Sequence, residues 1–109
     1  MATTYKVLGQ VNPSATTATT AYTVPSATQT VVSSISVCNQ ASSAATYRIA
    51  VRPAGATLAA QHYIVYGATV PASDTTVLTI GLTLSATDVV TVYSSSATLS
   101  FNLYGSEIA

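Results

Sequence analysis

The chain has 109 residues, 49% of them hydrophobic, and its three basic and three acidic residues make up only 6% of it and cancel. This length predicts one domain with a single core, which must be largely aliphatic because the chain has one phenylalanine, no tryptophan and seven tyrosines. Soluble domains average about 25% charged residues, so the scarcity of charge argues against partners attracted by basic surfaces, namely nucleic acid and anionic membranes.

The N-terminal part of the chain predicts two strands separated by a low-complexity segment. Thr4 to Val11 is a short alternating run, with Tyr5, Val7 and Gly9 on one face and Lys6 and Leu8 on the other. It ends at Asn12-Pro13, because proline cannot donate a hydrogen bond to a sheet. Residues 12–21, rich in Ser, Thr and Ala, are expected to form an extended arm or a long loop. Tyr22 to Val24 then predicts a brief strand that ends at Pro25.

The stretch from Gln29 to Gly55 predicts two long strands joined by a loop of small residues. In the first strand, simple alternation places Val31, Ile35 and Val37 on one face. The second, Tyr47 to Arg52, alternates more regularly. This period of two is typical of half-buried antiparallel sheet.

The remaining sequence predicts four further strands. Leu58 to Gln61 is expected to form a short helical turn or a loop. Gly67 is expected to mark a bulge and Gly81 an interruption within their strands. The strands, rich in β-branched and aromatic residues, are His62 to Val70, Thr75 to Leu84, Val89 to Ser94 and Thr98 to Tyr104, the last two joined by an expected hairpin at Ser95 to Ala97.

Two corners of the chain share the pattern V-P-x-x-x-x-T-V, from Val24 to Val31 and from Val70 to Val77. Convergent turn chemistry explains the match better than duplication, and related corners suit a two-sheet sandwich. All segments together give about eight strands, spaced as in sandwiches and jelly rolls. The predicted fold is therefore all-β, a single antiparallel β-sandwich or jelly roll of about eight strands over residues 1–109.

Few side chains are suited to catalysis or metal binding. Cys38 and His62 are the only residues of their types, so a thiol nucleophile and its base would have to be this pair. Cys38 is expected to be an inert core thiol and His62 a packing residue. Of the three carboxylates, Asp74 and Asp88 are expected to stabilise turns, and a catalytic pair with Glu107 is not expected. No catalytic, cofactor or metal site is predicted, and the chain is not expected to be an enzyme.

Arg48 and Arg52 lie four residues apart on the same face of one predicted strand. They either pair with acidic groups within the fold and protect the strand from aggregation, or reach carboxylates or carbonyls of a neighbouring subunit, since arginine is enriched at interface hot spots. Tyrosines offer amphipathic rings for a core edge, an interface or stacking on sugars. The predicted interface residues are Arg48, Arg52, Tyr63, Tyr66 and Tyr104.

The surface is expected to be hydrated by hydroxyl groups rather than by ions, because Ser, Thr and Ala make up nearly half of the chain. Such a surface lacks the charge repulsion that opposes association, so we expect copies of the chain or a partner to cover much of it. No stretch has the length of a signal-peptide core or a membrane span, which predicts synthesis in a cytoplasm and no membrane insertion. Cys38 is the single cysteine, so an internal disulfide is excluded.

Four segments between Tyr22 and Ile108 carry a family resemblance when taken together. They read TVVSSISVCNQ, TYRIAVRPAG, HYIVYGATVPASDTT and LSATDVVTVYSSSATLSFNLYGSE. As a set they resemble small virion structural proteins of tailed bacteriophages, including phages of cyanobacteria. The resemblance implies a non-enzymatic β-sandwich repeated many times in the particle, and it leaves capsid, neck, baseplate and tail positions open.

The expected function is that of an oligomeric capsid decoration or cement protein that stabilises the shell, located in the virion after synthesis in the host cytoplasm. The expected partners are copies of the chain itself, such as in a trimer, and other virion proteins such as the major capsid protein. Neither nucleic acid nor membrane is expected. The alternatives are a neck, baseplate or tail-fibre attachment component, or a carbohydrate-binding adhesin module, which would need exposed aromatic rows.

Overall fold

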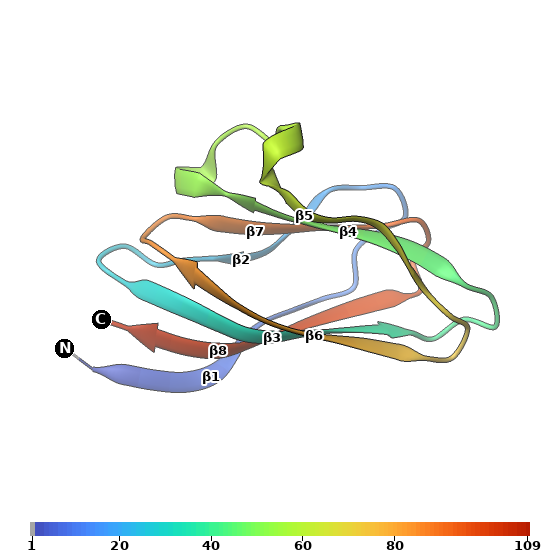
Figure 1. Cartoon of the computed structure of the whole chain (residues 1–109), viewed down its shortest axis with the longest axis horizontal. Helices are drawn as coiled ribbons and strands as arrows, with labels where there is room; N and C mark the ends of the chain where they lie inside the picture. The colour runs from blue at the N-terminus through green and yellow to red at the C-terminus, as the bar shows by residue number, and fades with distance from the viewer. Residues whose placement is uncertain (1) are drawn as a thin grey trace.

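The computed structural model describes residues 2–109 as eight strands and two short 3-10 turns (Figure 1). No helix in this part of the chain is long and apolar enough to cross a membrane. The elements are β1 (Thr3–Val11), β2 (Thr19–Thr23), β3 (Gln29–Asn39), β4 (Ala45–Arg52), η1 (Pro53–Gly55), η2 (Ala60–His62), β5 (Tyr63–Val70), β6 (Thr75–Leu84), β7 (Val89–Ser94) and β8 (Leu99–Ile108).

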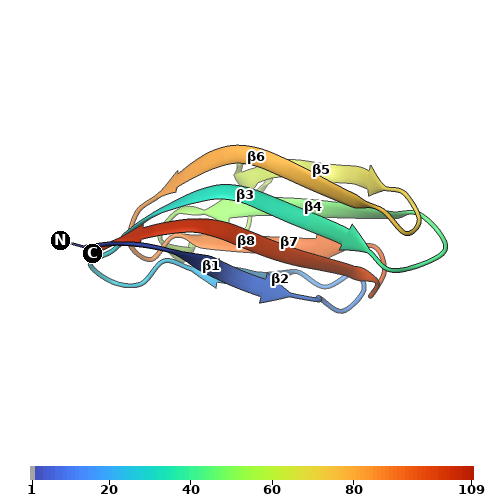
Figure 2. The ribbon, with the colours of Figure 1, turned by 90° about the horizontal axis from the view of Figure 1, so that it is seen from below.

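The strands form two four-stranded antiparallel sheets, which confirms the predicted fold class. Sheet A has the order β1-β8-β3-β6 and sheet B the order β2-β7-β4-β5. The pairs β1 with β8, β2 with β7, β3 with β6 and β4 with β5 are nested about the middle of the chain, as in a long hairpin rolled into a jelly roll. Figure 1 shows sheet B above sheet A with both 3-10 turns above sheet B, and Figure 2 looks onto the outer face of sheet A.

The repeated V-P corners both carry the chain from sheet B to sheet A. The first connects β2 to β3 and the second connects β5 to β6. The fourth residue of each pattern adopts a left-handed conformation, with φ of 54° at Ala27 and 52° at Ser73. The two corners therefore share a backbone conformation as well as a sequence pattern. Both connect the two sheets, which agrees with the predicted sandwich.

Several local expectations are wrong, because most consecutive strands, β4 and β5 excepted, lie in different sheets and because two strand boundaries differ from the predicted ones. β2 begins at Thr19, inside the segment expected to be an arm or loop, and β8 continues to Ile108. Residues 95–97 close no hairpin, since β7 and β8 lie in different sheets. β3 and β4 likewise face each other across the core and do not pair.

A bulge in β3 changes which valine enters the core. The register of β3 against both of its neighbours shifts between Val32 and Ser34. As a result Val32 is fully buried with Ile35 and Val37, whereas Val31, which simple alternation groups with them, is only partly buried. The extra residue advances the buried face by one position. The expected bulge at Gly67 is confirmed, because the register of β5 skips it and its φ is 80°.

The core between the sheets is mainly aliphatic, as the composition predicts. Phe101 is fully buried, and its ring meets the buried ring of Tyr47 edge to face with centroids 6.1 Å apart. The fully buried aliphatic residues around it come from both sheets and include Ile35, Ile49, Val70, Val90, Val92, Leu99 and Leu103. Because one side of each sheet is used in this way, the two outer faces carry the candidate sites.

Candidate interaction surfaces

The structure does not bring together the thiol and the imidazole. Cys38 lies opposite Thr75 and Ser100 on the outer face of sheet A and is partly buried, so its expected place in the core is wrong. His62 lies in η2 above sheet B, where its Nδ1 accepts a hydrogen bond from the Ala59 backbone N–H at 3.0 Å. Cys38 therefore belongs to sheet A and His62 to η2, which lies above sheet B on the far side of the sandwich (Figure 1).

Two carboxylates stabilise turns, as the sequence predicts. Asp88 accepts hydrogen bonds from the backbone N–H groups of Ala54 at 2.8 Å and Ser85 at 2.9 Å. Asp74 accepts one from the N–H of Thr75 at 2.7 Å. Within residues 2–109 no three His, Cys, Asp or Glu side chains are grouped so that they could hold a metal ion. These carboxylates are engaged by backbone donors at the ends of the sandwich.

The third carboxylate, Glu107, belongs to a polar network that links the two sheets. It lies on β8 and accepts hydrogen bonds from the Tyr22 hydroxyl of β2 and, at 3.0 Å, from the Lys6 ammonium group of β1. The Tyr22 hydroxyl also shares a hydrogen bond of 2.8 Å with Thr30. The bonds from Tyr22 and Lys6 lower the pKa of Glu107, while burial and the bond to Glu107 raise the pKa of Tyr22 to about 12.

The lowered pKa of Glu107 predicts that stability depends on pH in the acid range. Because its pKa is lower in the folded than in the unfolded chain, ionised Glu107 stabilises the fold above its ordinary pKa of 4.5, and this contribution is lost as the pH falls through the folded pKa. The midpoint temperature of Glu107→Gln should therefore fall less than that of the wild type between about pH 5 and about pH 3. Scanning calorimetry measures both proteins, and parallel curves would contradict the assignment.

Arg48 lies on the outer face of sheet B between two tyrosine rings. The register places it opposite Tyr66 on β5 and Tyr93 on β7. Its guanidinium carbon is 4.2 Å from the centroid of each ring, well within the range of about 6 Å for cation–π attraction. Tyr66 also meets Tyr63 edge to face, with centroids 4.9 Å apart. The structure thus unites three predicted interface residues, Arg48, Tyr63 and Tyr66, and adds Tyr93.

One of the two interpretations of the arginines, that they pair with acidic groups within the fold, is wrong. Among residues 2–109 the one ion pair joins Lys6 to Glu107. Arg52 forms hydrogen bonds with the loop that follows β4. Its Nε donates to the carbonyl of Ala56 at 2.8 Å and its Nη2 donates to the carbonyl of Gly55 at 3.1 Å. Arg52 therefore stabilises this loop and has fewer donors free for a partner.

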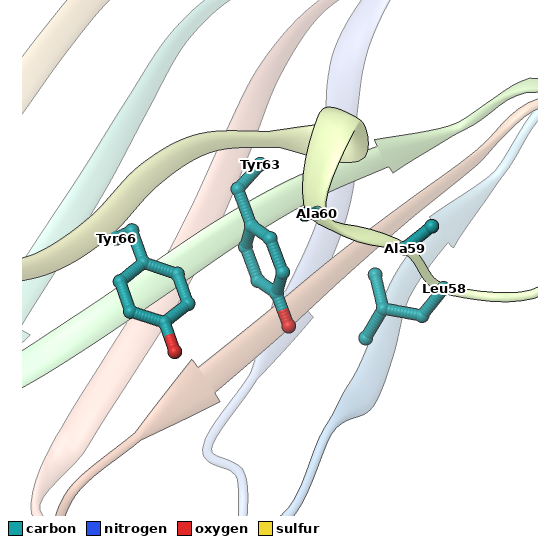
Figure 3. A pocket seen from close by; sticks show the side chains of 5 residues that line it. All are labelled: Leu58, Ala59, Ala60, Tyr63 and Tyr66. Atoms are coloured by element: carbon teal, nitrogen blue, oxygen red, sulfur yellow. The ribbon is translucent and has the colours of Figure 1, made fainter.

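An open pocket of about 630 Å³ lies beside the tyrosines (Figure 3). It is lined by Tyr63, Tyr66 and the loop residues Leu58, Ala59 and Ala60. In Figure 3 the two hydroxyl groups point in the same direction, with the Leu58 side chain beyond Tyr63. Regular alternation would place residues three apart on opposite faces, but shifts in the register of β5 against β4 place both rings on one face. The loop residues carry no recognisable signal in the sequence.

The outer face of sheet A carries no charged side chain within the part of the chain that the structure describes. Lys6 and Glu107 are the charged residues of its four strands, and they pair on the inner side. The outward positions combine small polar with exposed apolar residues, among them Tyr5, Val7, Ser34, Ser36, Val77, Thr79, Asn102 and Tyr104. Tyr104 and Arg48, both predicted interface residues, therefore lie on opposite faces of the sandwich.

Strand β6 forms one edge of sheet A (Figure 2). Edge strands usually resist pairing with other chains by carrying charged residues or proline, and β6 contains neither between Thr75 and Leu84. Its one irregularity lies opposite Ser33, where Gly81 has a φ of 57° and the register shifts. The free side of β6 can therefore accept a further strand.

Comparisons with known proteins identify no relative of the chain. No protein-family model matches the chain, and neither a curated protein nor a solved structure matches it significantly. The outer face of sheet A, the edge β6 and the tyrosine-lined pocket of sheet B are the candidate interaction surfaces.

Proposed function

We propose that the chain is a non-enzymatic structural protein of a bacteriophage particle, an oligomeric decoration or cement protein that stabilises the shell through sheet A. The observation that supports this most is the uncharged outer face of sheet A, next to the edge strand β6, which contains neither charge nor proline. The virion setting rests on the sequence resemblance to small structural proteins of tailed phages.

The outer face of sheet A is suited to contact with protein. An interface that buries no charge avoids the largest cost of desolvation. Exposed Tyr5, Val77 and Tyr104 supply apolar contact, and Val77 exposes 62% of its surface in the single chain. Strand β6 adds the possibility of main-chain hydrogen bonds to a strand of a neighbouring subunit.

A neck, baseplate or tail-fibre attachment component would use the same surface and differs in copy number. A protein that covers the shell is present in many copies distributed over it. A neck or baseplate protein is present in a single ring of copies. Quantifying the chain relative to the major capsid protein in purified particles separates these roles.

Val77→Lys is expected to exclude the protein from particles without unfolding it. Because Val77 is exposed, the free chain tolerates a lysine there, but an interface on sheet A would bury the new charge without a partner, at a cost of several kcal/mol. Occupancy in purified particles, measured by quantitative mass spectrometry, should fall by about tenfold or more.

Thr69→Lys provides the matched control. Thr69 is an exposed residue of β5 in sheet B, so the variant adds the same charge at a strand position outside the proposed interface. This variant should enter particles as the wild type does. Full occupancy by the Val77→Lys protein would rule out sheet A as the attachment surface.

A further inference from the structure

Arg48 lies between two tyrosine rings and has unused hydrogen-bond donors. Its guanidinium carbon lies 4.2 Å from the rings of Tyr66 and Tyr93, which approach from the strands on either side of β4. Cation–π attraction acts on the charge of a guanidinium and does not require its five N–H donors. Within residues 2–109 Arg48 takes part in no ion pair, and its donors are exposed to water.

The outer face of sheet B is consequently electropositive at this point. The charge of Lys6 is neutralised by Glu107, and Arg52 already donates to the loop carbonyls of Ala56 and Gly55 and to the hydroxyl of Thr91. Asp88 is bound by backbone N–H groups in its turn. A ligand for Arg48 should therefore be an anion, and the paired N–H groups of a guanidinium match the two oxygens of a carboxylate.

The pocket adjoins Arg48 through the ring of Tyr66. Its volume of about 630 Å³ lies in the range of roughly 300–1,000 Å³ that is typical of small-molecule sites. The wall combines apolar surface from Leu58 and the aromatic rings with the hydroxyl groups of Tyr63 and Tyr66 (Figure 3). Such a wall suits a sugar ring, which presents C–H groups to an aromatic face and hydroxyl groups at its rim.

We propose that the outer face of sheet B binds an acidic saccharide. One sugar ring of the saccharide would occupy the pocket, and a carboxylate of the same saccharide would bind Arg48. An aspartate or glutamate of a partner protein would also satisfy Arg48, but it has no ring to fill the pocket. Tyr66 lies between Tyr63, at a centroid distance of 4.9 Å, and the guanidinium carbon of Arg48, at 4.2 Å, so a ligand that reaches both the pocket and Arg48 extends beyond one ring. This inference is independent of the virion proposal.

Titration of the full chain with matched oligosaccharides tests the proposal. The probes are trigalacturonic acid and its methyl ester, and sialyllactose and its methyl ester, and within each pair only the carboxylate differs. We expect at least one acidic probe to bind about tenfold or more tightly than its neutral counterpart, because a charge-assisted bond to arginine is lost with the carboxylate. Equal binding within both pairs, or no binding of any probe, would overturn the proposal.

Variants locate the site. Arg48→Gln should bind an acidic probe as weakly as its neutral counterpart, and Tyr66→Ser should weaken both. Tyr5→Ser is the matched control, because Tyr5 is an 83% exposed tyrosine on sheet A. This substitution should leave saccharide binding unchanged. Circular dichroism checks that each variant folds. If no saccharide binds while Arg48→Gln lowers the occupancy of particles, Arg48 recognises a carboxylate of a partner protein and the saccharide site is refuted.

Discussion

Gly105→Ala is expected to disrupt sheet A and to leave little folded protein at room temperature. Gly105 lies on β8 between β1 and β3, opposite Lys6 and Val32. A Cβ atom at this position would lie 1.9 Å from the carbonyl oxygen of Val31 and 3.0 Å from the Cα of Val32. Both are backbone atoms of β3, so no rotamer change relieves the overlap, and β8 and β3 must separate in the middle of the sheet, where the ladders of β8 with β1 and with β3 meet.

The expected loss in the free energy of unfolding is more than about 4 kcal/mol, a large part of the roughly 5–15 kcal/mol of a typical domain. Urea unfolding followed by circular dichroism measures it. Gly67→Ala is the control, because a Cβ atom at Gly67 would have no other atom within 4 Å and the φ of this residue is 80°, so the substitution should cost only about 1 kcal/mol. Equal stabilities of the two variants would show that β8 and β3 do not approach as described.

Asn39→Ala is expected to destabilise the fold by about 3 kcal/mol or more. Asn39 ends β3 and is 1% exposed. Its Nδ2 donates to the carbonyls of Ser43, Val70 and Pro71 at 2.9–3.2 Å, and its Oδ1 accepts from the Ala41 N–H at 3.0 Å and from the hydroxyl of Thr98 at 3.1 Å. One buried amide thus joins three connections at the same end of the sandwich.

The alanine variant leaves several of these buried groups without partners, which costs more than the hydrogen bonds contribute. Gln40→Ala is the control, since the neighbouring Gln40 side chain is exposed and should change stability by less than about 0.5 kcal/mol. Chemical denaturation provides both values. A loss below about 1 kcal/mol for Asn39→Ala, on the order of a single exposed hydrogen bond, would mean that the loops are held by other contacts.

Much of the strand pattern is predictable from the sequence because its determinants are local. Alternation, proline-led turns and glycine positions identify most of the strands, and the two V-P corners indicate a change of sheet. The face that each strand buries is less predictable where a bulge intervenes. The extra residue at Ser33 exchanges Val31 for Val32 in the core, and a single-residue shift of this kind leaves no mark in the hydrophobic pattern.

The candidate sites were predictable only in part, because they depend on pairing between distant segments. Arg48, Tyr63 and Tyr66 stand out in the sequence, but the second ring over Arg48 comes from Tyr93 on β7, which only the register reveals. The uncharged face of sheet A combines β1, β8, β3 and β6, strands that are far apart along the chain. The position of Tyr104 on that face follows from the same strand order.

The two outer faces have different properties and support separate roles. Within the described residues the outer face of sheet A is uncharged and ends in the edge strand β6, which suits close contact with other subunits. Sheet B offers a recessed aromatic pocket next to a cation whose donors face water. A protein attached through sheet A would present the pocket of sheet B outward, where it could meet a ligand in solution or on a cell.

Imaging of purified phage particles at residue resolution tests the central claim most directly. We predict density for this jelly roll in many symmetry-related copies on the shell, with the outer face of sheet A against neighbouring protein and Val77 buried in the contact. Absence of the chain from purified particles, or its presence with sheet A turned toward solvent, would contradict the account.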